Sequence, residues 1–194
     1  MPLRLLSQMP RYLEILLSIF LMLALLPLML CIFLAVKFDS KGAGIHWSKR
    51  VGCNSVNFMM PKFRTMRLGV PNVATDRLET PNEYITSVGV LLRRTSLDEI
   101  PQLWSVLIGD MSFVGPRPAL FNQYELIARR QDLKIDQLKP GVTGWAQVNG
   151  RDEISMQEKI ELDSWYMEHR SVWLDLKILM MTIWFIIRQE KISH

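Results

Sequence analysis

The chain is poor in cysteine: its 194 residues include two, Cys31 and Cys53. Cys31 lies in a long apolar block and Cys53 in a polar segment, so the two do not form a metal-binding motif. A single pair is also too few for a disulfide scaffold. A reducing compartment is the simpler interpretation, because disulfides persist mainly in oxidising compartments.

The sequence also lacks the glycine-rich loops G-x-x-x-x-G-K-[ST] and G-x-G-x-x-G, so a classical nucleotide-binding fold is unsupported. It has no long run of basic residues, although its formal net charge is +4. Nucleic acid is therefore not expected as a partner, because such proteins normally carry a visible basic stripe. A modest positive balance suits an anionic lipid surface or phosphorylated substrates.

One long apolar block is present near the N-terminus. Residues 15–36 carry no charged side chain, and at ~1.5 Å per residue they form roughly 33 Å of helix, enough to cross a hydrocarbon core. A cleaved signal peptide is rejected because its apolar core is shorter and ends in a small-residue cleavage site. Here Lys37, Phe38 and Asp39 follow the block.

Pro27, near the middle of this block, predicts a bend or a break, because proline lacks an N–H and displaces a preceding carbonyl. Arginines precede the block, and lysines and Arg50 follow it. Positive charge on both flanks gives no clear orientation. From the residues alone, a kinked transmembrane helix and a re-entrant helix with both ends on one side remain open.

A second apolar block lies at the C-terminus, from Ser171 to Ile187, and Asp175 and Lys177 interrupt it. The uninterrupted part is short for a membrane span. Trp173 and Trp184 have rings of the kind favoured at lipid headgroup depth. These features predict a helix in the membrane interface, with a buried core helix as the alternative.

Between the two blocks, the pattern predicts an α+β, mostly helical domain with short strands and several ordered loops. Strands are expected at 45–51 and 56–66, and a loop at 69–82. Helices are expected at 84–94, 100–108, 122–137 and 153–168, the last with Ile154, Ile160, Leu162 and Trp165 as candidate buried positions.

Asp98 and Glu99 form an acidic pair beside a predicted helix start. Two adjacent carboxylates could bind Mg²⁺ together with substrate phosphate, or one of them could attack phosphorus. The structural alternative is a capping box from Ser96 to Glu99. Pro101 argues against that alternative, because proline suits the first position of a helix and clashes further in.

Basic residues that could bind a diphosphate occur in three segments. Arginine's planar fork suits phosphate oxygens, although each residue alone could equally be a solvated surface charge. The candidates are Lys62 and Arg64, Arg117 between two prolines, and Arg151 after a glycine-rich loop. His46, beside Trp47, is interpreted as structural.

Five segments resemble, in order and spacing, the bacterial sugar transferases known as monotopic phosphoglycosyl transferases. They are Arg50-Val51-Gly52, PKFRTM (61–66), RRTSLDEIPQLW (93–104), GDMSFVGPRP (109–118) and PGVTGWAQVNGR (140–151). The resemblance extends over nearly the whole chain. So many long motifs in one order make the match specific.

The resemblance implies transfer of a sugar-1-phosphate from a UDP-sugar to undecaprenyl phosphate, with release of UMP, at the start of polysaccharide, O-antigen or glycoprotein glycan synthesis. It places the family's catalytic dyad on Asp98 and Glu99. Asp98 would form the covalent phosphosugar intermediate, and Glu99 would help to hold Mg²⁺ or manage protons. Lys62, Arg64, Arg117 and Arg151 would contact the phosphates or the nucleotide.

The resemblance also implies a re-entrant membrane helix at 1–36 and a cytosolic catalytic domain at 37–194, at the cytoplasmic face of a bacterial inner membrane. Leu26 stands where the family has a serine before the proline. Two alternative functions are a non-catalytic membrane scaffold of a glycan-assembly complex and a lipid-diphosphate hydrolase. The sugar is not readable from the sequence, and a homodimer is left open.

Overall fold

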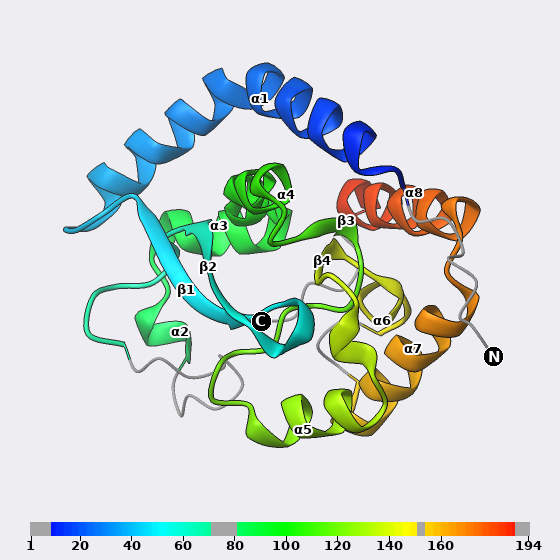
Figure 1. The fold of residues 1–194 in the computed structure, drawn as a ribbon. Coiled ribbons are helices and arrows are strands. Elements are labelled where there is room, and N and C mark those ends of the chain that lie inside the picture. The colour runs from blue at the N-terminus through cyan, green and yellow to red at the C-terminus, as the bar shows by residue number, and fades with distance from the viewer. Residues whose placement is uncertain (1–8, 71–80, 151–153, 189–194) are drawn as a thin grey trace.

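The computed structural model describes residues 9–70, 81–150 and 154–188. It is a mostly helical α+β fold, as expected, in which a long N-terminal helix arches over one side of a globular body formed by the other elements (Figure 1). The strands are short and form two separate pairs.

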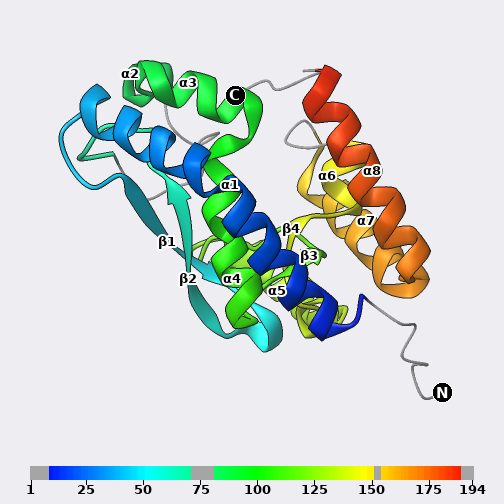
Figure 2. The same ribbon diagram turned by 90° about the horizontal axis from the view of Figure 1, so that it is seen from above.

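Helix α1 runs from Arg11 to Asp39 without interruption and includes Pro27. Its buried residues are Glu14, Ser18, Ile32 and Val36, so most of its apolar surface faces outward. Seen from above, α1 crosses over α4 (Leu103–Ile108), with α3 (Ser87–Thr95) towards one end and α8 (Val172–Arg188) beside the other (Figure 2). Among the described residues, α1 is the helix long and apolar enough to cross a membrane.

Strands β1 (Ile45–Val51) and β2 (Asn57–Phe63) form an antiparallel ribbon joined by the 3-10 turn η1 (Cys53–Ser55). The predicted first strand has these bounds, and the second is shorter than predicted. His46 pairs with Lys62 in the register. Because alternate residues of a strand share a face, His46 and Arg50 lie on the same face of the ribbon as Lys62.

After α2 (Pro81–Tyr84) and α3, the chain forms the 3-10 helix η3 (Leu97–Gln102) and then α4. The predicted single helix at 100–108 is therefore wrong at its start. Pro101 lies inside η3, not at the first position of an α-helix. A 3-10 turn accommodates the proline there because α4 begins only after it.

A parallel pair of strands, β3 (Ser112–Val114) and β4 (Gly141–Thr143), was not predicted. The backbones approach so closely that a Cβ on Gly141 would lie 2.1 Å from the nitrogen of Gly115. Glycine is thus required at this crossing. The two glycine-rich motifs of the sequence meet here.

The predicted helix at 122–137 is in fact two elements, α5 (Tyr124–Asp132) and η4 (Ile135–Gln137). Lys134 between them has a left-handed backbone with φ of 60°, which ends the regular helix. Helix α6 (Trp145–Asn149) then follows β4.

Helix α7 (Met156–His169) begins with a capping box between Ser155 and Glu158. Ile160 is buried as predicted, but Trp165 is 38% exposed, and the buried positions are Asp163 and Tyr166. In the following helix, α8, the buried residues are Asp175 and Ile178. Because most other side chains of α8 are not buried, the helix suits the predicted membrane interface better than a position in the buried core.

The main hydrophobic core lies between α1, α4, the β3–β4 pair and α7–α8. Its buried members include Val106, Met111, Val114, Tyr166 and Ile178, and Leu17, Leu21 and Leu25 of α1 pack against it. A second cluster joins the C-terminal half of α1 to β2 and α3 through Ile32, Val36, Phe63 and Leu92. Both halves of α1 are thus packed on the same body.

Candidate active site

Asp98 and Glu99 lie in the first turn of η3, directly after a sharp reversal of the chain. Ser96 makes this reversal with a left-handed backbone, φ 56°, at the end of α3. Its side chain makes no capping hydrogen bond to the following helix. The capping-box alternative is therefore not what the structure shows, and the carboxylates have other partners.

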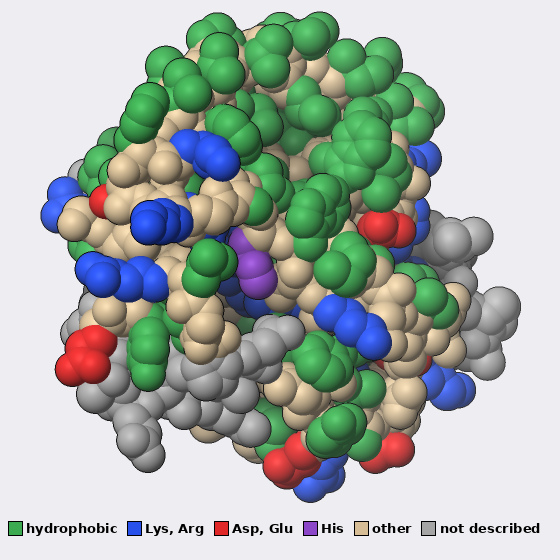
Figure 3. Space-filling view, turned by 90° about the vertical axis from the view of Figure 1, so that its left-hand side faces the viewer, with side chains coloured by type: hydrophobic (Ala, Val, Ile, Leu, Met, Phe, Trp, Pro, Cys, Tyr) green, Lys and Arg blue, Asp and Glu red, His purple; other side chains and the backbone are tan. Residues whose placement is uncertain are grey.

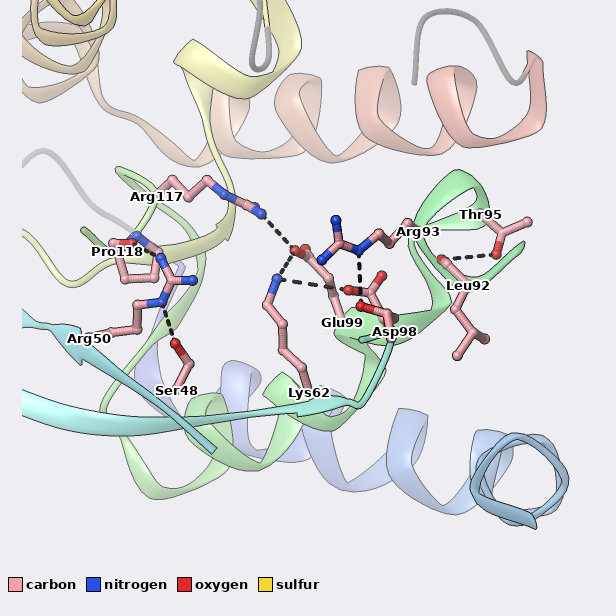
Figure 4. A network of polar contacts seen from close by, with 11 residues as sticks. Ser48, Arg50, Lys62, Leu92, Arg93, Thr95, Asp98, Glu99, Arg117 and Pro118 are labelled. Carbon is pink, nitrogen blue, oxygen red and sulfur yellow. Dashed lines mark hydrogen bonds and ion pairs between the residues drawn. The ribbon is translucent and has the colours of Figure 1, made fainter. Parts of the chain in front are cut away.

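Lys62 at the end of β2 contacts both carboxylates. Its Nζ donates a hydrogen bond of 2.6 Å to Oε1 of Glu99 and lies 3.9 Å from Oδ2 of Asp98. Arg117 donates from Nη2 to the same Oε1 at 2.8 Å. Figure 4 shows the two cations approaching Glu99 from different sides. Glu99 thus holds Lys62 and Arg117 together, although they are distant in sequence.

The two carboxylates differ in electrostatic environment. Although burial opposes it, the charges of Arg117 and Lys62 and their hydrogen bonds hold the pKa of Glu99 far below its usual range. For Asp98, burial outweighs the attraction of Lys62 and raises the pKa. Glu99 is therefore a firmly held anion, whereas Asp98 is a less compensated and more basic carboxylate.

Two further arginines border the site and were not assigned to it from the sequence. Arg50 donates to Oγ of Ser48 at 3.0 Å and to the carbonyl of Pro118 at 3.2 Å. Burial and the nearby Arg117 lower the pKa of Arg50 to about 10. Arg93 donates to Oγ1 of Thr65 at 2.9 Å, and its charge acts on Asp98.

The sequence contained a signal for both arginines, because Arg50 and Arg93 are the first residues of two of the motifs that match the family. What was missing was the pairing of β1 with β2 and the turn at Ser96. These two features bring both arginines beside the carboxylates.

Arg64 is not brought to this cluster. Its guanidinium is buried against the C-terminal end of α1, where it donates to the carbonyls of Ser40 at 2.7 Å and Lys41 at 2.8 Å and to Oγ of Ser40 at 2.9 Å. A cation is favoured there because the last carbonyls of a helix lack partners. Arg151 lies outside the described residues, so its predicted role stays a prediction.

The described residues contain no group of three or more His, Cys, Asp or Glu side chains suited to a metal ion. Two carboxylates can still suffice for Mg²⁺, which usually keeps several waters and takes its other ligands from substrate phosphate. The fit is better at Asp98, whose carboxylate lies 3.9 Å from Lys62, than at Glu99, whose Oε1 already accepts from both Lys62 and Arg117.

One face of the molecule combines an apolar surface with basic side chains. Hydrophobic side chains gather over its upper part, where α1 lies, and Lys and Arg side chains line a hollow below them (Figure 3). The large exposed apolar residues come mostly from α1, α4 and α8, among them Phe20, Leu23, Trp104, Trp173 and Met180. An exposed apolar surface of this extent is typical of a membrane or protein contact.

Comparison with known proteins identifies the family. The sequence model described as "Bacterial sugar transferase" matches residues 6–189. The chain belongs to the bacterial sugar transferase family. The resemblance seen in its motifs is thereby confirmed over almost the entire chain.

Among the relatives is the "Uncharacterized sugar transferase EpsL" of Bacillus subtilis (strain 168), 43% identical over 75% of this chain and 70% of that protein. A second is the "UDP-glucose:undecaprenyl-phosphate glucose-1-phosphate transferase" of Escherichia coli (strain K12), 39% identical over 88% of this chain. A third is the "Undecaprenyl-phosphate galactose phosphotransferase" of Salmonella typhimurium, 34% identical over 93% of this chain.

The last two relatives are considerably longer than this bacterial sugar transferase. The matched region makes up 38% of the Escherichia coli protein and 40% of the Salmonella protein. The chain therefore matches less than half of the length of either of these two relatives.

Proposed function

We propose that this sugar transferase moves a sugar-1-phosphate from a UDP-sugar to undecaprenyl phosphate, giving an undecaprenyl diphosphate sugar and UMP. The relatives' names provide the substrate class. The observation that carries the proposal is the cluster in which Lys62 and Arg117 meet Glu99 beside the buried Asp98. Such a cluster presents a nucleophile and cations to the same diphosphate.

In the first step, a carboxylate oxygen of Asp98 attacks the phosphorus that carries the sugar. A P–O bond to Asp98 forms, the bond to the bridging oxygen breaks, and UMP leaves with the electron pair. In the second step, an oxygen of the lipid phosphate attacks the same phosphorus. The bond to Asp98 then breaks, the carboxylate is regenerated, and the diphosphate bond of the lipid product forms.

The raised pKa of Asp98 suits the attacking group, because a more basic carboxylate is the better nucleophile. Glu99 suits a supporting role, because its charge is already engaged by Lys62 and Arg117. Those two cations would neutralise phosphate oxygens as negative charge builds up. Arg50 adds a third cation at the border of the cluster.

Mg²⁺ would be held by the carboxylate of Asp98 or Glu99 together with the diphosphate. It would supply charge neutralisation of phosphate oxygens. The side chains of Lys62 and Arg117 provide the same kind of stabilisation from the protein.

We propose that α1 is re-entrant. At its start, Arg11 donates to the carbonyl of Leu107 at 2.8 Å, and Glu14 accepts a hydrogen bond from Ser112. At its end, Arg64 binds Ser40. Because both ends are bonded to one body, a helix that placed its ends on opposite sides of a bilayer would have to break one set of contacts.

A site at headgroup depth suits the reaction, because each buried CH₂ of a lipid chain is worth ~0.8 kcal/mol and extraction of the lipid is costly. The exposed apolar faces of α1 and α8 would enter one leaflet, and the basic hollow beneath would meet the lipid phosphate. We assign this leaflet to the cytoplasmic side of the bacterial inner membrane, where UDP-sugars would be available.

The test is UMP release by purified protein given Mg²⁺, undecaprenyl phosphate and a panel of UDP-sugars, with trapping of labelled sugar phosphate on the protein. Asp98→Asn should abolish both release and labelling. Asp132→Asn, at an exposed position of α5, is the matched control and should retain both. Full activity of Asp98→Asn would remove the nucleophile assignment.

Two outcomes would redirect the proposal. Release of inorganic phosphate from added undecaprenyl diphosphate, with no UMP from any UDP-sugar, indicates a lipid-diphosphate hydrolase. Failure with every UDP-sugar, while partner proteins still bind, indicates a membrane scaffold.

A further inference from the structure

Arg117 reaches Glu99 from a backbone segment that is constrained on both sides. Pro116 and Pro118 fix their own φ angles, and the residue before a proline is restricted to extended conformations. The backbone on either side is also bonded to other elements: Gly141 donates to the carbonyl of Pro116 at 3.0 Å, and Val51 donates to the carbonyl of Ala119 at 2.9 Å. The carbonyl of Arg117 itself is held by a side chain.

Arg130 of α5 holds that carbonyl. Its Nη1 donates to the carbonyl oxygen of Arg117 at 2.8 Å, and its Nη2 donates to Oδ2 of Asp163 on α7 at 2.6 Å. Arg130 is 7% exposed and Asp163 is 1% exposed. The segment that carries Arg117 is thus bonded to two helices through one buried guanidinium.

A second arginine donates a hydrogen bond to the same segment, one residue later. Arg50 of β1 donates to the carbonyl of Pro118 at 3.2 Å, and Figure 4 shows this contact beside the cluster. Arg130 and Arg50 therefore bind successive carbonyls from different elements. Two such contacts define both the position and the orientation of the peptide between them.

The buried ion pair between Arg130 and Asp163 stabilises the position of the Arg130 side chain. Burial raises the pKa of the Asp163 carboxyl, and the guanidinium of Arg130 acts against that rise. Removing either partner leaves a buried charge without compensation, which is costly. A movement of the Arg117 carbonyl would likewise leave a donor of Arg130 unpaired in the interior.

We propose that Arg130, held in place by Asp163, is a positioning residue that aims Arg117 at Glu99. It need not contact substrate. Its effect passes through the carbonyl of Arg117 to the cation that meets the phosphate. The proposal deepens the proposed function, and its kinetic test rests on that function.

The kinetic test is a double-mutant cycle in the UMP-release assay. Arg130→Met should lower kcat by about 10-fold to 100-fold, because misplacing a catalytic group by about 1 Å has an effect of that size. Arg130→Lys, which can still donate to the carbonyl, should restore part of the activity. Arg129→Met removes the same charge from an exposed position of α5 and should leave kcat unchanged.

The decisive comparison uses an Arg117→Ala background. There, Arg130→Met should lower kcat further by less than about twofold, because the group it positions is already gone. If the loss has the same fold-change in both backgrounds and follows the fall in the thermal midpoint, Arg130 is merely structural and the proposal is overturned.

A readout without activity separates this proposal from the proposed function. Phenylglyoxal modifies accessible arginines, and mass spectrometry measures its rate at Arg117 in the full chain. Arg130→Met and Asp163→Asn should raise that rate several-fold, whereas Arg129→Met should not. An unchanged rate at Arg117 in both buried-pair variants overturns the positioning role even if no UDP-sugar is found to react.

Discussion

The ammonium of Lys62 lies 2.6 Å from Oε1 of Glu99 and joins β2 to the turn that carries Asp98 and Glu99. The same ammonium is 3.9 Å from Asp98. One cation therefore fixes Glu99 and at the same time acts on the proposed nucleophile. In the proposed reaction, this ammonium is already beside the reacting groups when the diphosphate enters.

Replacing Lys62 by Met should lower kcat for UMP release by about 100-fold, because it removes one preorganised donor to developing charge. Lys62→Arg should keep part of the activity, since the charge is retained with a different geometry. Initial rates with a saturating UDP-sugar measure the effect. Lys49→Met, at an exposed position of the same ribbon, is the control. Equal rates for Lys62→Met and the control would show that Lys62 does not stabilise the developing charge.

Arg64 should behave differently from Lys62, although both belong to the PKFRTM segment. Its hydrogen bonds end on Ser40 and Lys41, so Arg64→Met should lower the thermal midpoint. The loss of one hydrogen bond to a buried charged group is worth about 1.5–3 kcal/mol. Thermal unfolding in detergent measures the shift.

The control for Arg64→Met is the activity of the folded fraction. It should remain near the wild-type value if Arg64 acts through α1. A large fall in kcat without a change in thermal midpoint would instead place Arg64 in the substrate site, as its sequence position first indicated.

The sequence predicted the elements whose information is local. Strand β1 has the expected bounds because its residues and flanking turns define it alone. The prediction that Ser96 and Glu99 form no capping box was also right, but its reason was wrong, because η3 begins directly after Ser96 and contains Pro101. The apolar block 15–36 predicted a helix, and its exposed side chains agree with a membrane environment.

The parts that the sequence did not predict depend on long-range contacts. The β3–β4 pair consists of two three-residue strands, which carry no periodic signal of their own. Arg50 and Arg93 reach the site only through strand pairing and through the turn at Ser96. Arg64 looked like a phosphate ligand because the position of the end of α1 was not known.

His46 should titrate below its ordinary pKa of 6.5. Burial is the main cause, and the charges of Arg50 and Lys62 add to it. A base with a lowered pKa in the folded state binds fewer protons than it does when unfolded. Its contribution to stability is therefore fully present above pH 6.5 and is lost as the pH falls through that value and below it.

Histidine ring resonances recorded against pH in ¹³C-labelled protein measure this pKa, and His46→Gln assigns the signal. Lys62→Met should move the pKa of His46 back towards 6.5, because one repelling charge is removed. A titration at or above 6.5 in the unaltered protein contradicts the predicted environment.

The two ends of α1 should face the same side of the membrane. In a background without Cys31 and Cys53, single cysteines at Tyr12 and Phe38 report on the two ends, which are 63% and 88% exposed in the structure. Both should react with a membrane-impermeant maleimide from the side that also labels Tyr124→Cys on α5. Leu23→Cys, on the outer surface of the arch, should be protected because it would lie within the leaflet. Labelling of positions 12 and 38 from opposite sides would show that α1 crosses the bilayer, and the contacts of Arg11 and Arg64 with one body could not then exist together.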